Sequence, residues 1–88
     1  MFVGKVVGSI VSTRKNEKLI GSKFMIVESV MDGSKARLVA VDNIGAGIGE
    51  IVLVATGSAA RLCCNFSDAP IDAAIVGIVD DGVGLSGM

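Results

Sequence analysis

The fold is decided by the stretch from residue 23 to residue 41, whose sequence is KFMIVESVMDGSKARLVAV. Two runs rich in aliphatic residues, 23–30 and 36–41, flank the pair Asp32 and Gly33. An Asp-Gly pair between such runs is a strong hairpin signal, because a type I′ turn needs positive φ at both central residues. The stretch therefore predicts two neighbouring strands joined by a turn.

Three further strands are predicted on either side of this hairpin, at residues 2–12, 50–55 and 73–80. Each is bounded by glycine, proline or polar residues, which is typical of an all-β domain. Before the last strand, Ser58 can cap a short helix over residues 59–62, which are good helix formers. Five short strands curl most economically into a small barrel. The expected fold is all-β, a small five-stranded OB-like barrel with one short helix between strands 4 and 5.

The 88 residues predict a single domain, with the barrel at residues 1–81 and a flexible tail at residues 82–88. Hydrophobic residues make up 51% of the chain and glycine contributes twelve more. Ordinary soluble domains are less apolar, and a domain this small buries only roughly 60–65% of the surface that its unfolded chain exposes. The excess apolar surface is therefore expected to face other subunits.

A membrane location is not expected. The longest aliphatic run, residues 51–55, is far shorter than the roughly 20 residues that a membrane-spanning helix needs. No basic segment leads an apolar region in the manner of a signal peptide, so a cytosolic location is expected.

Charge and residue inventory argue against two functional classes. Eight basic and nine acidic residues give a net charge of −1, which is no electrostatic footprint for nucleic acid. The three phenylalanines are too few to form the stacking platforms of a single-strand binder. Histidine, the commonest general acid or base, is absent. No enzyme activity, cofactor, metal or nucleic-acid partner is expected, and an OB-like module for single-stranded nucleic acid or a small ligand remains the alternative.

Two adjacent thiols, Cys63 and Cys64, are disfavoured as a disulfide because a bridge requires a specific separation and direction of the two Cα atoms. Both are expected to be reduced and to fill apolar space beside a buried segment.

The candidate functional segment is glycine-rich and consists of Gly45, Ala46, Gly47, Ile48, Gly49 and Glu50. Its G-x-G-x-G spacing differs from the dinucleotide fingerprint G-x-G-x-x-G, and the residues after it predict a strand where the fingerprint needs a helix. Two interpretations stay open. The segment is either a tight turn between strands or a place where several copies of the backbone approach one another at a symmetry axis.

Four stretches of sequence, in order, together carry a family resemblance. They are VGKVVGSIVST with KLIGSK (residues 3–13 and 18–23), VAVDNIGAGIGEIVLV (39–54), GSAAR (57–61) and PIDAAIVGIVD (70–80). These stretches resemble the EutN/CcmL family, the pentameric vertex proteins of carboxysomes and related bacterial microcompartments. The likeness covers nearly the whole chain.

The resemblance implies a structural protein, a homopentamer that caps the fivefold vertices of a microcompartment shell in the bacterial cytoplasm. It also implies hexameric shell proteins as partners. On this interpretation the segment at residues 45–50 is the candidate for the region nearest the fivefold axis, lining a narrow pore. Arg61 and Asp72 become candidates for intersubunit or turn-fixing hydrogen bonds, with a pair inside one subunit as the alternative.

Overall fold

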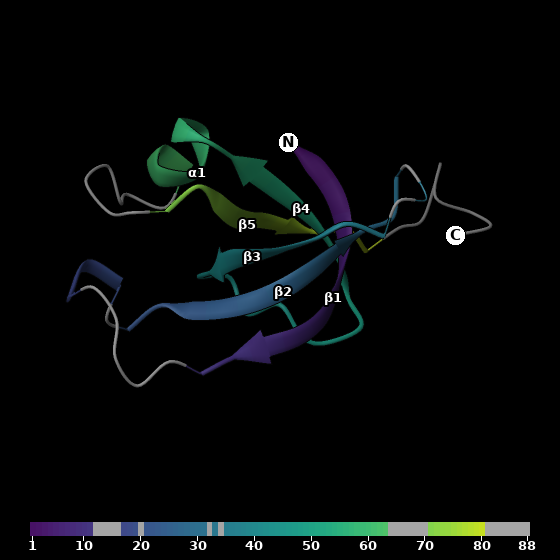
Figure 1. The fold of residues 1–88 in the computed structure, drawn as a ribbon, viewed down its shortest axis with the longest axis horizontal. Coiled ribbons are helices and arrows are strands. Elements are labelled where there is room, and N and C mark those ends of the chain that lie inside the picture. Colours follow the sequence, from purple (N-terminus) through teal and green to yellow (C-terminus); the bar gives the residue numbers. More distant parts are fainter. Residues whose placement is uncertain (12–16, 20, 32, 34, 64–70, 81–88) are drawn as a thin grey trace.

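The computed structural model is a closed β-barrel with one short α-helix (Figure 1). It describes residues 1–11, 17–19, 21–31, 33, 35–63 and 71–80. The elements are β1 (Phe2–Ile10), η1 (Glu17–Leu19, a 3-10 turn), β2 (Lys23–Ser29), β3 (Arg37–Asp42), β4 (Ile51–Thr56), α1 (Ser58–Cys63) and β5 (Ala73–Ile78). The predicted fold class, the five strands and the helix between strands 4 and 5 are confirmed.

The strands follow the order β1-β2-β3-β5-β4 around the barrel, and β4 closes it against β1. The predicted hairpin forms β2 and β3, which pair antiparallel from Lys23–Asp42 to Glu28–Arg37. β5 pairs antiparallel with β4 but parallel with β3, where only Val41 and Asp42 have partners. Among the described residues, positions 37–40 of β3 therefore lack a strand partner on the side away from β2.

Element ends differ from the predicted ones by one or two residues. β3 and β4 each extend one residue beyond prediction, to Asp42 and Thr56, while β5 ends at Ile78. Ser58 is the first residue of α1 rather than a cap before it, because the helix begins directly after Gly57, whose φ is +66°. The end of a helix or strand depends on a single terminal hydrogen bond, so local sequence determines it less well than the middle of the element. Asp32 of the predicted turn and the predicted tail at residues 82–88 lie outside the described residues.

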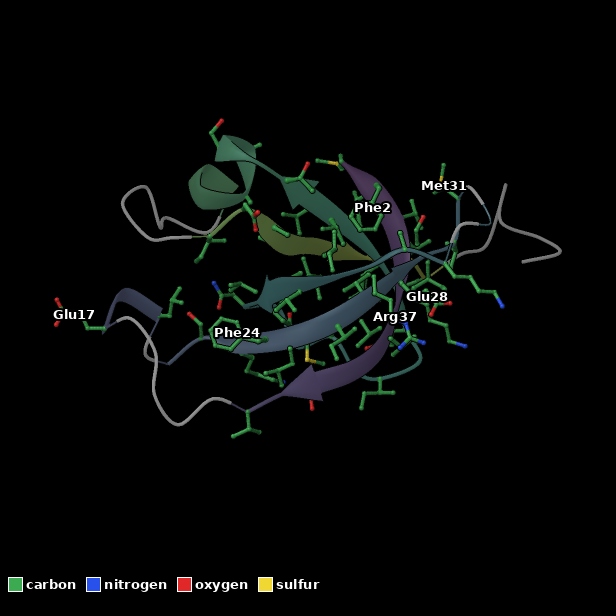
Figure 2. The ribbon with its side chains drawn as sticks, in the orientation of Figure 1. Phe2, Glu17, Phe24, Glu28, Met31 and Arg37 are labelled. Carbon is green, nitrogen blue, oxygen red and sulfur yellow. The ribbon has the colours of Figure 1, made fainter. Side chains whose placement is uncertain are left out.

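The main core fills the inside of the barrel. Alternate residues of each strand point inward, so that Val52 and Val54 of β4 are fully buried while Leu53 between them points outward. Figure 2 shows Phe2 and Phe24 toward opposite ends of the barrel, and Phe2 packs against this core. The buried members are Val6, Met25, Val27, Ala40, Ala46, Val52, Val54, Ala73 and Ile75.

A second, smaller cluster lies on the outside of the barrel where β3 meets β5. Val41 and Ala74 point outward from these strands and are covered by Ala60 of α1 and by Ile71. Leu19 of η1 packs against the same cluster, as does Phe24 of β2. The short helix therefore covers the parallel seam between β3 and β5. Fully burying a side chain such as Val41 or Ile71 stabilises the fold by about 1.5–3 kcal/mol.

Candidate functional site

The loop of residues 45–50 joins β3 to β4 and passes below β2 in Figure 1. It buries one small side chain and exposes one large one, and a second large side chain is exposed just before it. Ala46 is 2% exposed and belongs to the main core, whereas Ile44 just before the loop is 46% exposed and Ile48 is 66% exposed. The Ala46 methyl group thus packs into the barrel interior, while the side chains of Ile44 and Ile48 are exposed to solvent.

The loop is held by the buried carboxylate of Asp42, the last residue of β3. Its Oδ1 accepts hydrogen bonds from the backbone N–H groups of Ile44 at 3.0 Å and Gly45 at 3.1 Å. Its Oδ2 accepts one from the backbone N–H of Ala46 at 2.8 Å. Asp42 is only 2% exposed, and these three bonds satisfy a charge that would otherwise be costly to bury.

Sequence reasoning missed the role of Asp42. One local signal was available, because an Asp in a turn after an apolar strand often accepts a hydrogen bond from the backbone N–H two residues onward, which here belongs to Ile44. The same rule does not indicate burial, since an isolated Asp is normally exposed.

The C-terminal half of the loop is held by hydrogen bonds within the loop and to β1. The Glu50 side-chain Oε1 accepts a hydrogen bond of 2.6 Å from the Gly47 N–H, and the Glu50 N–H donates one of 3.1 Å to the Gly47 carbonyl. The Gly49 N–H donates to the Val6 carbonyl at 2.7 Å, and the Val6 N–H donates to the Glu50 carbonyl at 2.9 Å. The carboxylate of Glu50 is therefore engaged within the loop.

Two of the three loop glycines adopt backbone conformations that other residues rarely take. Gly45 has a φ of +86° and Gly49 a φ of +95°. The interpretation of this segment as a tight turn therefore has a conformational basis. Its placement at a symmetry axis stays a prediction, because that placement concerns several copies of the chain.

Asp72 lies exposed just before β5, and its carbonyl accepts a hydrogen bond of 2.7 Å from the Gly57 N–H. This backbone bond joins the residue before α1 to the residue before β5 and does not involve the Asp72 side chain, whose role stays a prediction. Arg61 is in α1, but its side chain lies outside the described ones, so its pairing with Asp72 stays a prediction. The side chain of Cys63 and all of Cys64 also lie outside them.

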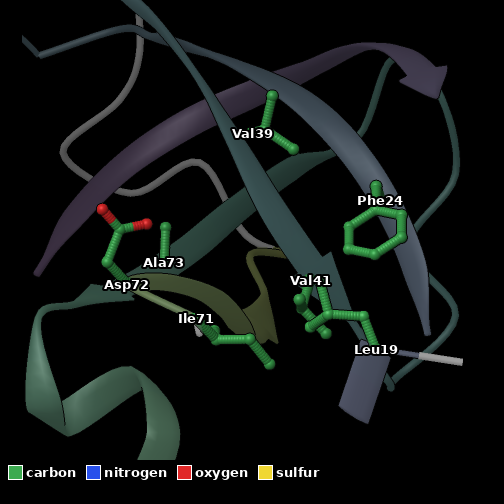
Figure 3. Close-up of a pocket in the computed structure, with 7 residues that line it drawn as sticks. All are labelled: Leu19, Phe24, Val39, Val41, Ile71, Asp72 and Ala73. Carbon is green, nitrogen blue, oxygen red and sulfur yellow. The ribbon is translucent and has the colours of Figure 1, made fainter. Parts of the chain in front are cut away.

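Two shallow hollows adjoin Asp72 on the outer surface, with volumes of about 170 Å³ and 430 Å³. Figure 3 shows the smaller one, with the side chains of Val39 and Phe24 on one side and that of Ile71 on the other. Val39, Asp72 and Ala73 line both hollows. The lining is apolar apart from the Asp72 carboxylate and Thr56, which suits contact with another apolar surface.

Within the described part of the chain, no group of three or more His, Cys, Asp or Glu residues is arranged to hold a metal ion. None of the helices found there is both long enough and apolar enough to cross a membrane. The features that stand out are instead a braced loop and apolar hollows on the outer surface of a small barrel. Apolar hollows of this kind are suited to contact with other chains.

Residues 1–80 match the family model described as ethanolamine utilisation protein EutN/carboxysome, and the chain belongs to the EutN/CcmL family. It is 49% identical over 85 residues to the bacterial microcompartment shell vertex protein GrpN of Rhodospirillum rubrum, covering 91% of this chain and 93% of the relative. It is 44% identical over 87 residues to the shell vertex protein PduN of Salmonella typhimurium, covering 91% and 96%.

Solved structures agree with this assignment. The GrpN pentameric microcompartment shell protein from Rhodospirillum rubrum superposes with a TM-score of 0.81, at 49% identity, over 92% of this chain and 95% of that one. The CcmL structure from Gloeobacter violaceus gives a TM-score of 0.83 at 36% identity, over 91% and 86%. The predicted family is confirmed.

Proposed function

We propose that this chain is a structural subunit that assembles into a homopentamer and caps the fivefold vertices of a bacterial microcompartment shell. The observation that carries the proposal is the likeness to GrpN, which is described as a pentameric shell protein and matches at 49% identity over almost the full length of both chains. On this proposal the chain acts in the bacterial cytoplasm, within the shell.

The physical character of the chain supports an assembly role. Half of its residues are hydrophobic, and several large apolar side chains are exposed in a single copy, among them Val39 at 47% and Ile48 at 66%. Large exposed apolar patches on small proteins usually mark contacts with other chains. A purely structural role without catalysis follows from the proposal.

The fivefold axis is proposed to lie nearest the 45–50 loop. Three features support this placement: the backbone is braced by Asp42 and Glu50, the loop is rich in glycine, and Ile48 projects from it. On this placement backbone groups, Ile48 and the Glu50 carboxylate, whose Oε1 accepts a hydrogen bond from the Gly47 N–H, would line a pore here.

The partners are proposed to be hexameric shell proteins. The experiment is co-expression of such hexamers from one microcompartment with and without this chain, followed by electron microscopy of the assemblies. A flat layer of hexamers needs fivefold points to close, so closed polyhedra are expected only when the chain is present. Closed polyhedra of equal number and shape in its absence would contradict the vertex role.

A further inference from the structure

The middle of β3 presents an apolar side chain to solvent at an unpaired strand edge. Val39 is 47% exposed, and it lies opposite Ile26 of β2, which is half-buried and also points outward. Outward positions of an antiparallel sheet that faces water are normally polar. At the next outward pair the pattern is indeed polar, since Arg37 Nε donates to Glu28 Oε2 at 2.9 Å (Figure 2).

The hollows on either side of Val39 exist because β3 and β5 overlap by only two residue pairs. β3 and β5 have no paired residues upstream of Val41, and Val39 there lines both hollows, the smaller of which is shown in Figure 3. We name this surface, defined by Leu38, Val39, Asp72 and Ala73, the Val39 groove. Asp72 at its rim makes no side-chain hydrogen bond or ion pair with the rest of the described chain.

A second surface, apolar apart from the exposed Lys5 opposite Ile51, lies on β1 and β4. Val3 of β1 pairs with Leu53 of β4, and both point outward because their neighbours in sequence point into the core. Ile51, two residues earlier on β4, points the same way, and all three are half-buried. We name this surface, defined by Val3, Ile51 and Leu53, the β1–β4 face.

The two surfaces are built from different residues. The Val39 groove lies over β3 and the start of β5, whereas Val3, Ile51 and Leu53 lie on β1 and on β4, the strand next to β5. A closed ring of identical subunits uses head-to-tail contacts, in which each subunit offers two different surfaces. The Val39 groove, which is hollowed, and the β1–β4 face are two such surfaces.

We infer that the Val39 groove of one copy receives the β1–β4 face of the next copy around the ring. This inference rests on the proposed pentamer and names the surfaces that form its contacts. A stable contact covers about 800 Å² per partner, so two contacts per subunit occupy about three tenths of the 5323 Å² surface of the single chain.

Three matched valine-to-glutamate variants test the inference by solution mass. Val39→Glu places a charge in the groove, Val3→Glu places one on the β1–β4 face, and Val11→Glu changes a 90% exposed valine that lies on neither surface. Val39→Glu and Val3→Glu are expected to be folded monomers by circular dichroism and light scattering, whereas Val11→Glu is expected to have the wild-type mass.

Mixing the two monomeric variants gives the sharpest result. The Val3→Glu chain keeps an intact groove and the Val39→Glu chain keeps an intact β1–β4 face. An equimolar mixture is therefore expected to form heterodimers, which cannot add further subunits because their remaining groove and remaining face each carry a glutamate. If Val3→Glu fails to fold, Leu53→Lys takes its place on the same face.

The outcomes separate this inference from the proposed function. A wild-type pentamer together with pentameric Val39→Glu, or a mixture that stays monomeric at high concentration, overturns the assignment of surfaces and leaves the pentamer standing. A wild-type chain that is itself monomeric overturns the proposed function, and the inference with it.

Discussion

The backbone N–H of Ala46 donates a 2.8 Å hydrogen bond to the Oδ2 atom of Asp42, and both residues are 2% exposed. The bond joins the last residue of β3 to the one loop residue that enters the barrel core. Since the other oxygen of the same carboxylate holds Ile44 and Gly45, one side chain fixes the first half of the loop. The shape of the outward-facing loop is therefore set from a buried position.

Asp42→Asn tests this dependence. The amide keeps one oxygen but replaces the other with an NH₂ group, so at least one backbone N–H loses its acceptor in either orientation. Hydrogen bonds to charged groups contribute about 1.5–3 kcal/mol, and the free energy of unfolding is expected to fall by roughly that amount. Denaturant titration at fixed protein concentration measures it, because subunit association also contributes to stability.

The matched control is Asp80→Asn, which changes an exposed carboxylate in the same way. Its free energy of unfolding is expected to stay within about 0.5 kcal/mol of wild type. An Asp42→Asn variant as stable as the Asp80→Asn variant would show that the carboxylate does not hold the loop.

Gly49→Ala tests the conformation at the other end of the loop. Gly49 has a φ of +95°, and a Cβ placed there meets no atom within 4 Å, so the expected loss comes from the backbone conformation alone. Adopting a left-handed conformation costs an alanine about 1–2 kcal/mol. Gly49→Asn is expected to lose less, because Asn adopts positive φ more readily. Equal unfolding free energies for wild type and both variants would contradict this account.

Gly4→Ala tests the close approach of β1 and β2. A Cβ at Gly4 would collide with Val27 Cγ1 and lie 2.9 Å from the Glu28 carbonyl oxygen. Overpacking of this kind typically costs about 1–3 kcal/mol, measured as a lower free energy of unfolding. Gly8→Ala is the control, since its Cβ would lie 3.5 Å from Ile26 Cδ1 in ordinary contact. Gly8→Ala is expected to be neutral or more stable by up to about 1 kcal/mol, and the opposite order would refute the packing argument.

The hairpin and the strand number were predictable because their signals are local. Aliphatic runs on both sides of Asp32 and Gly33 predict β2 and β3. Because a short connection joins these two strands, they pair antiparallel, from Lys23 with Asp42 to Glu28 with Arg37. The connection at residues 45–50 between β3 and β4 was likewise visible as a cluster of glycines. Such features depend on residues a few positions apart in sequence.

The parallel seam was not predictable, because it joins segments more than 30 residues apart through two pairs, Val41 with Ala74 and Asp42 with Ile75. The burial of Asp42 follows from that seam and from the loop that folds back over it. The exposure of Val39 has the same origin, since β5 diverges from β3 before reaching it. Sequence patterns therefore placed the candidate loop correctly between strands but gave no sign of the groove.

The central claim is that five copies of the chain assemble into a ring. The solution mass of the purified protein tests this claim most directly. Light scattering coupled to size exclusion is expected to give a mass close to five times the 8.9 kDa of one chain. The mass is expected to hold on dilution through the micromolar range. A mass of one or two chains under the same conditions would contradict the pentamer, and with it the proposed role at shell vertices.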